Sequence, residues 1–427
     1  MAQSSSNAAG RPVLVAGSLD TKGAEVAFLR DRLRAGGLAV QVIDFGILGP
    51  PPFQPEVPRD TIAEAAGESI ADLVSAADRG RAVAAMQKGL AAWVRRRRET
   101  DPPAGMLAIG GSAGTAVATA GMRELPIGVP KLMVSTMASG DVRVYVGTSD
   151  ICMMYSVADF TGLNRLTTTI LSNAADAIAG MCGHRAPLVE TSGRTLLGAT
   201  MFGVTTPCVN RVKELVEQAG YELLVFHATG TGGQAMERLV TDGFIKGVLD
   251  ITTTELADEL VGGVLTAGPH RMEAAAKIGV PQVVSVGALD MVNFGAPETV
   301  PPKFLGRQFY PHNPSVTLMR TTVEENRQLG TILAGKLNQA TGPVTLLLPL
   351  RGVSAIDRHG KPFHDENADK ALFDALRSHL RPPVKLVEIS CHINDPEFAS
   401  AIVAEFFKQM EAPLCQHAGA STSGGKE

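Results

Sequence analysis

Short apolar runs alternate with amphipathic segments along most of the chain. Residues 12–17 (PVLVAG) form such a run, and residues 24–34 follow with apolar side chains at helical spacing. Similar runs recur as LAVQVIDFG, GMLAIGG, KLMVST, TLLGATMFG, YELLVFHA, IKGVLDI, PQVVSVG, PVTLLLPL and PVKLVEIS. Continuous apolar strands between helices are typical of parallel sheets with helices on both faces. The pattern therefore predicts an α/β protein with mostly parallel sheets covered by helices.

The alternation breaks once, at a polar stretch near the middle of the chain. Residues 183–194 (GHRAPLVETSGR) follow a helix-like segment, and the strand pattern restarts at Thr195. We therefore expect two Rossmann-like domains, residues 12–185 and residues 194–414. Ligands of such domains bind beyond the carboxyl ends of the strands, so candidate residues are sought in the loops that follow each apolar run.

Four segments lack the pattern of regular elements. Residues 1–11 and 415–427 are small and polar, which predicts disorder at both ends. Residues 46–58 and 295–314 are rich in proline, which predicts long irregular segments.

The charge balance restricts the partners. With 39 basic and 43 acidic residues the formal net charge is −4, so no global cationic field attracts DNA or an anionic membrane. Residues 102–122 carry no charge but are mostly Gly, Ala, Ser and Thr around a short apolar run, which favours strand, glycine loop and helix over a membrane span. We expect neither DNA nor a membrane as partner.

The five cysteines indicate a reducing compartment. They are odd in number, widely spaced and never in a C-x-x-C arrangement, which argues against a disulfide framework and a zinc knuckle. The N-terminus lacks the charged and apolar regions of a signal peptide. We therefore expect a cytoplasmic protein.

Glycine accounts for 45 of the 427 residues, above the usual ~7%, and part of this excess follows strands of the first half. The segments are GSLDTKGAE, IGGSAGTAVATAG and VSTMASGDVRVYVGTSD. Glycines admit a ligand to the backbone, N–H groups at a helix start bind anions, and hydroxyls donate to phosphate oxygens. The candidate nucleotide-binding residues are Gly17, Ser18, Asp20, Thr21, Lys22, Gly23, Gly110, Gly111, Ser112, Gly114, Thr115, Ser135 and Thr136.

Asp20 is also the candidate ligand of Mg²⁺, held through water. The loop is not a Walker A motif, because G-x-x-x-x-G-K-[ST] is absent from the chain. A structural interpretation stays open for the same residues: Asp20, Thr21 or Ser112 as a helix N-cap, and Lys22 as a surface cation.

The second half contains a further glycine loop. Residues 230–235 (GTGGQA) follow a predicted strand and match G-x-G-x-x-[GA], and Asp250 ends the next strand about 20 residues on, as a dinucleotide fingerprint requires. His227 and Thr229, which precede the loop, are not part of that fingerprint. We therefore prefer a loop that binds the anion of a phosphorylated or carboxylated substrate, and NAD(P) remains the alternative.

Polar residues at other strand ends complete this second candidate site. The candidate substrate-binding residues are Thr229, Gly230, Gly232, Gly233, Thr253, Arg351 and Ser354. The candidate catalytic residues are His227, Asp250, Asp290 and His392, because a histidine oriented by a carboxylate serves as a general base. The alternative for each histidine is a hydrogen-bonded structural role.

Several of these motifs occur together in a known family. In chain order, GSLDTKG, GGSAGT, VSTMASGD, HATGTGGQAMERL, GVLDITTTE, VSVGALDMVNF and LPLRGVSAIDRHGKPFHD resemble the ATP-binding region of the tomato mosaic virus resistance protein family, whose many bacterial members lack an assigned activity. The resemblance covers nearly the whole chain. Ala113 departs from it, because the family pattern has a second glycine there.

The resemblance implies a nucleotide-binding N-terminal domain, a second α/β domain, ATP with Mg²⁺ as ligands, and homodimers. Plant members carry an additional TIM-barrel domain, which implies a separate TIM-barrel partner protein for this chain. We expect ATP–Mg²⁺ in the first half and a small carboxylate, carbonyl or phosphorylated metabolite near residues 227–233. Two alternatives stay open: an NAD(P)-dependent oxidoreductase that uses residues 230–235 and Asp250, and a nucleotide-responsive binding protein without catalysis.

Overall fold

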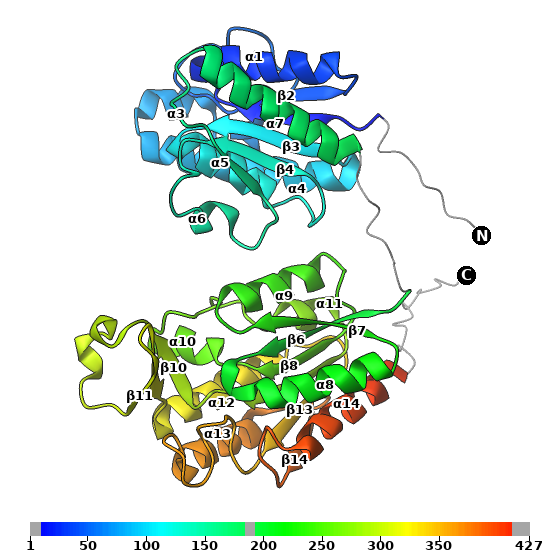
Figure 1. Cartoon of the computed structure of the whole chain (residues 1–427), viewed down its shortest axis with the longest axis vertical. Helices are drawn as coiled ribbons and strands as arrows, with labels where there is room; N and C mark the ends of the chain where they lie inside the picture. The colour runs from blue at the N-terminus through cyan, green and yellow to red at the C-terminus, as the bar shows by residue number, and fades with distance from the viewer. Residues whose placement is uncertain (1–9, 184–192, 412–427) are drawn as a thin grey trace, which may run out of the picture. The chain divides into compact units, whose positions relative to one another are not determined.

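The computed structural model describes residues 10–183 and 193–411. The chain divides into two compact units, residues 1–191 (the first unit) and residues 192–427 (the second unit) (Figure 1). Apart from residues 10 and 11, the ends for which the sequence predicts disorder lie outside the described residues.

The first unit contains a parallel five-stranded sheet in the order β2-β1-β3-β4-β5. Its strands are β1 (Val13–Gly17), β2 (Val40–Asp44), β3 (Gly105–Gly110), β4 (Lys131–Ser135) and β5 (Cys152–Tyr155). The strand order reverses beside β1, because β2 lies on one side of it and β3 on the other. Such a switch point leaves a crevice beyond the carboxyl ends of the strands, where ligands of α/β proteins bind.

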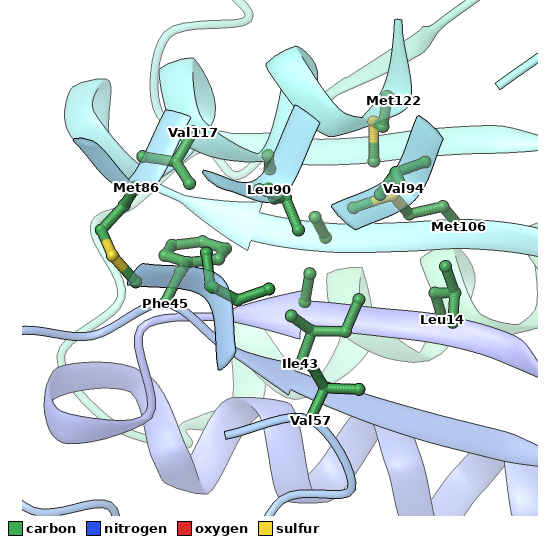
Figure 2. Close-up of a cluster of buried hydrophobic side chains, with 14 of the residues drawn as sticks. Leu14, Ile43, Phe45, Val57, Met86, Leu90, Val94, Met106, Val117 and Met122 are labelled. Atoms are coloured by element: carbon green, nitrogen blue, oxygen red, sulfur yellow. The ribbon is translucent and has the colours of Figure 1, made fainter. Parts of the chain in front are cut away.

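Helices cover both faces of this sheet. One face carries α1 (Leu19–Ala35) and α7 (Arg165–Gly183). The other carries α2 (Arg59–Ala66), α4 (Arg79–Thr100) and α5 (Ser112–Met122), whose apolar side chains belong to one cluster with those of β1, β2 and β3. Figure 2 shows side chains of α4 and α5 packed on those of the strands. Two short helices, α3 (Ile70–Ala76) and α6 (Arg143–Val146), complete the unit.

The uncharged stretch 102–122 folds into β3, a glycine loop and α5, which confirms the arrangement predicted for it. Within residues 10–183 and 193–411, no helix combines the length and the apolar character that a membrane crossing requires.

The second unit repeats the same plan with one more strand. Its parallel sheet has the order β14-β13-β9-β8-β6-β7 and reverses beside β6. The strands are β6 (Leu196–Met201), β7 (Glu222–His227), β8 (Val248–Thr252), β9 (Gln282–Gly287), β13 (Val344–Pro349) and β14 (Lys385–Ile389). The prediction of two Rossmann-like units with mostly parallel sheets is confirmed.

Helices again lie on both faces. Helices α8 (Thr206–Gln218) and α14 (Pro396–Glu411) pack on one face. The other face carries α9 (Thr231–Thr241), α10 (Glu255–Val261), α11 (Ala274–Ile278), α12 (Val323–Leu337) and α13 (Glu366–His379).

A small antiparallel sheet lies between β9 and β13 in the sequence. Its strands are β10 (Met291–Phe294), β11 (Phe309–Asn313) and β12 (Val316–Arg320), in the order β10-β12-β11. The proline-rich stretch 295–314, predicted to be irregular, therefore contains a strand. Pro311 is tolerated because β11 is an edge strand, where a missing N–H costs no ladder bond, and the register shifts directly after it.

Candidate functional site

A cavity of about 970 Å³, the first cavity, opens at the carboxyl edge of the first unit's sheet. Loops after all five strands contribute to its lining. The predicted nucleotide-binding residues among the lining are Ser18, Asp20, Thr21, Lys22, Gly111, Ser112, Gly114 and Thr136. Three motifs that are far apart in the sequence therefore converge on one space at the switch point.

The remaining candidates of this set lie behind the cavity wall. Thr115 and Ser135 are fully buried, and their hydroxyl oxygens are 2.6 Å apart, which ties α5 to the end of β4. A Cβ added at Gly17 would lie 2.7 Å from Val26 Cγ2, and one at Gly23 would lie 2.3 Å from Pro52 Cγ. These residues allow the loops to pack rather than contact a ligand. Gly110 belongs with them, because an added Cβ would lie 2.8 Å from Gly114 Cα.

The N-terminus of α5 faces the first cavity with free N–H groups. Gly111 is its N-cap and has no side chain, so the interpretation of Ser112 as the N-cap is wrong. The amides of Ser112, Ala113 and Gly114 have no acceptor in the described part of the chain, where Thr115 N–H makes the first bond, to Gly111 O at 2.8 Å. Unpaired amides at a helix start carry partial positive charge and bind anions.

The N-cap of α1 is Ser18, whose side chain makes no capping bond, so Asp20 and Thr21 do not cap this helix. Lys22 is half-buried, and its ammonium group donates to the carbonyl oxygen of Phe160 at 3.4 Å. The cation therefore lies at the cavity wall rather than free on the surface.

Two carboxylates at this edge have unused oxygens. Asp20 Oδ2 accepts from Leu48 N at 2.6 Å, and Asp44 Oδ1 accepts from Leu19 N at 3.0 Å and Gly46 N at 2.8 Å. Asp20 Oδ1 and Asp44 Oδ2 are buried without a hydrogen-bond partner among the described residues. Burial raises the pKa of Asp44, and the neighbouring Asp20 raises it further. Carboxylate oxygens of this kind fit a divalent cation such as Mg²⁺.

The first cavity also has an apolar part. It is lined by Phe45, Leu73, Val74, Val83, Met86 and Val117, most of them from α3, α4 and α5. The sequence motifs did not point to these residues, because α3 and α4 lie far from the glycine loops in the sequence and look like ordinary core helices. Asp44 is buried close to Asp20 and does not line the cavity. The sequence analysis did not consider it, because it is the last residue of an apolar strand.

The glycine loop of the second unit already holds an anion of its own chain. The N–H groups of Gly230 and Gly233 donate to Glu255 Oε1 at 2.7 and 3.1 Å. Glu255 Oε2 accepts from Arg271 Nε at 2.6 Å, and all of these groups are buried. The amides predicted to bind a substrate anion are therefore saturated by a carboxylate 25 residues away in the sequence.

Asp250 is also engaged. Its two oxygens accept from Arg271 at 2.6 and 2.7 Å, and Oδ1 additionally accepts from Thr200 Oγ1 at 2.7 Å. A dinucleotide site requires this acid for ribose hydroxyls, so the geometry does not support the NAD(P) alternative. A Cβ at Gly232 would lie 1.8 Å from His227 O, so this glycine is needed for packing of the loop itself.

The predicted catalytic residues do not converge on His227. That histidine is exposed at the end of β7, and within the described residues neither Asp250 nor Asp290 hydrogen-bonds to its ring. Thr229 Oγ1 bonds to His227 O at 3.3 Å, and the buried Thr253 Oγ1 bonds to Ser285 O at 3.2 Å. The expected site around residues 227–233 is not assembled in this form.

Other members of the predicted set do come together. Ser354 Oγ donates to Asp290 Oδ2 at 2.7 Å, and His392 Nε2 lies 2.8 Å from Ser354 O. His392 Nδ1 accepts from Asn394 N at 3.1 Å, so Nε2 carries the hydrogen, and burial lowers the pKa of this histidine. Arg351 and His392 line a second cavity, of about 660 Å³, beyond the carboxyl ends of β13 and β14.

Comparison with known proteins agrees with the two units. The N-terminal domain of uncharacterised protein family UPF0261 matches residues 11–187, and the C-terminal domain of the same family matches residues 194–410. This chain belongs to the UPF0261 family. A UPF0261 protein of Clostridium tetani is 50% identical over 402 residues, which cover 94% of this chain and 99% of that protein.

The family extends to plants. The ToMV resistance protein Tm-1(GCR237) of Solanum lycopersicum is 48% identical over 338 residues, 77% of this chain but only 45% of the tomato protein, which confirms the resemblance seen in the motifs. Among solved structures, UDP-N-acetylglucosamine 2-epimerase from Rickettsia bellii aligns over 94% of this UPF0261 chain and 96% of its own, at 9% identity and a TM-score of 0.22. That score supports no conclusion about this chain.

Proposed function

We propose that the first unit of this UPF0261 protein binds ATP with Mg²⁺ in the first cavity. The observation that carries the proposal is the N-terminus of α5, whose three unpaired amides line a cavity at the switch point of a parallel sheet. Amides placed in this way bind the phosphates of nucleotides in many α/β proteins. The hydroxyls of Ser112 and Thr136 and the ammonium of Lys22 supply further donors on the same wall.

The first cavity suits the remaining parts of the nucleotide. Its apolar part offers a place for the adenine ring, and its volume is within the range of about 300–1,000 Å³ that small-molecule sites occupy. Asp20 and Asp44 would hold Mg²⁺ through their unpartnered oxygens, and the ion would neutralise phosphate charge. The proposal is limited to binding, because no observed group assigns a reaction to the nucleotide.

The test is calorimetric titration of ATP–Mg²⁺ into the full chain and into Gly111→Ala. A methyl group at residue 111 would have only Thr136 Oγ1 within 4 Å, at 3.8 Å, so it narrows the cavity without an internal clash. We expect at least about tenfold weaker binding, or ~1.4 kcal/mol, with the urea midpoint unchanged. Binding should also weaken when EDTA removes the metal ion.

Gly335→Ala is the matched control. This glycine is exposed on α12 in the second unit, and an added Cβ meets nothing within 4 Å. Its variant should bind ATP–Mg²⁺ like the wild type. The proposal fails if millimolar ATP–Mg²⁺ gives no saturable heat, or if Gly111→Ala binds as tightly as the control. Release of phosphate during the incubation would separate an enzyme from a nucleotide-responsive binder.

A further inference from the structure

The second cavity is built from four separate segments of the second unit. These are residues 350–352 after β13, residues 358–364, helix α13, and residues 392–395 after β14. Gly352 fixes the first of them: its φ is +120°, and an added Cβ would lie 1.8 Å from Asp357 O. The cavity is therefore a defined product of the fold rather than a gap beside a loose loop.

One cation of the lining lacks a counter-charge. The guanidinium of Arg351 has no hydrogen bond or ion pair among the described residues, although its backbone N–H is held by Cys391 O at 3.0 Å. The other cations of the lining are paired within the chain: Arg358 with Asp395, Lys370 with Asp374, and Arg377 with Asp374 and Glu388. Arg351 is exposed, so water solvates its guanidinium, which is free to bind an anion that enters the cavity.

Another part of the lining has unused polar atoms. His364 lines the cavity, and its Nδ1 is buried without a hydrogen-bond partner in the described chain. It lies 4.0 Å from Asp357 Oδ1, which also has no hydrogen bond there and is 3.7 Å from Arg320 Nη2. Asp369 also lines the cavity, and its Oδ1 accepts from Arg320 Nη2 at 2.8 Å.

Three buried carboxylates share that single arginine. Asp290, Asp357 and Asp369 surround Arg320. Asp290 Oδ1, like Asp357 Oδ1, is buried without a hydrogen-bond partner among the described residues. Burial, with the neighbouring Asp357, raises the pKa of Asp369 to about 8. Asp369 and the imidazole of His364 are therefore polar groups on the wall of the cavity that Arg351 also lines.

We propose that the second cavity binds a small molecule that carries a carboxylate or phosphate group, with the anionic group on Arg351 and a polar group directed to His364 and Asp369. The planar guanidinium matches both anions through two parallel hydrogen bonds. The volume of about 660 Å³ suits a metabolite rather than a macromolecule. The site is formed by residues of the second unit alone and is independent of the nucleotide proposal.

The test is calorimetric titration of malonate and of inorganic phosphate into the full chain, Arg351→Ala, Arg351→Lys and Arg381→Ala. Arg381 is the control because it is exposed in the same unit and does not line the cavity. We expect saturable binding of at least one anion by the wild type and by Arg381→Ala. The affinity should fall tenfold or more in Arg351→Ala. It should fall by less in Arg351→Lys, which keeps the positive charge but cannot form two parallel hydrogen bonds.

The probe that binds more tightly, malonate or inorganic phosphate, shows whether the site prefers a carboxylate or a phosphate. ATP–Mg²⁺ titrated into each variant shows that the first unit is intact, and circular dichroism with thermal unfolding shows that the second is. The proposal is overturned if neither anion gives a saturable response in the wild type, or if Arg351→Ala and Arg351→Lys bind as tightly as Arg381→Ala. Neither result would bear on nucleotide binding in the first unit.

Discussion

Adjacent glycines in the α5 loop have different physical roles. A Cβ at Gly110 would lie 2.8 Å from the Cα and carbonyl carbon of Gly114, so this glycine permits a backbone contact. A Cβ at Gly111 would meet only Thr136 Oγ1, at 3.8 Å, so this glycine leaves space at the wall of the first cavity. Overpacking at residue 110 is expected to reduce stability by about 1–3 kcal/mol, whereas residue 111 affects only the ligand.

At the same scale, Asp369 should make stability fall as pH rises. Its pKa in the folded protein is about 8, because of burial and the nearby Asp357, against about 3.9 in an unfolded chain. Between these values the folded state binds more protons than the unfolded state, so the free energy of unfolding decreases with pH. Asp369→Asn is neutral throughout and should flatten this decrease, measured by urea unfolding across the same window.

Asp290 shares the effect, since burial and Asp357 raise its pKa to about 7. The Asp369→Asn variant should therefore retain part of the pH dependence. Asp60→Asn, on the exposed side of α2, is the control and should keep the full wild-type slope. An Asp369→Asn slope equal to that of the control would contradict the assignment.

At the scale of elements, the two units use the same helix start in different ways. In the first unit the amides of the first three residues of α5, Ser112, Ala113 and Gly114, have no acceptor in the described part of the chain. In the second unit the amides at the start of α9 are bound by Glu255, from the first turn of α10, and Arg271 holds that carboxylate in place. In the second unit these amides therefore link α9 to α10 instead of facing a cavity, and we call this contact the joint.

Glu255→Gln should therefore destabilise the second unit. The change leaves Arg271 with one buried carboxylate fewer, and breaking a buried ion pair typically costs about 3–5 kcal/mol. Urea unfolding of the full chain, followed by circular dichroism, measures the loss.

Glu298→Gln provides the comparison, because Glu298 is exposed in the same unit. Its unfolding midpoint should match the wild type. A Glu255→Gln variant as stable as Glu298→Gln would mean that the buried carboxylate contributes little to the joint.

At the scale of the whole molecule, each proposed ligand has a cavity within one unit. Hydrogen exchange followed by mass spectrometry should show ATP–Mg²⁺ slowing exchange in residues 17–23 and 110–115. The anion that binds Arg351 should slow exchange in residues 350–364. A ligand that orders a loop lowers the population of its open states, and exchange reports that population.

The variants separate the two effects. Gly111→Ala should abolish only the protection by ATP–Mg²⁺, and Arg351→Ala only the protection by the anion. Protection of both sets of residues by either ligand alone would show that the two sites are not independent.

Much of the arrangement follows from local patterns in the sequence. Every apolar run singled out by its pattern forms a strand of one of the two parallel sheets, and the three glycine- and hydroxyl-rich loops of the first half meet at one cavity. Four strands were missed: β5, which is short and partly exposed, and all three strands of the small antiparallel sheet, of which β11 contains Pro311. All four depend on pairing with a neighbouring strand, which local sequence does not specify.

The sequence by itself determined the alternation of strands and helices and the positions of the glycines, because periodicity and backbone freedom are properties of adjacent residues. Only the tertiary structure decided which glycine loop keeps its amides free. Glu255 lies 25 residues beyond Gly230, where the loop begins, and Arg271 lies 41 residues beyond it. No pattern in the sequence between them marks either residue as a partner of the loop. Because this long-range contact saturates the amides, the glycine loop of the second unit has a structural role. The ligand site that we propose for this unit lies instead at Arg351.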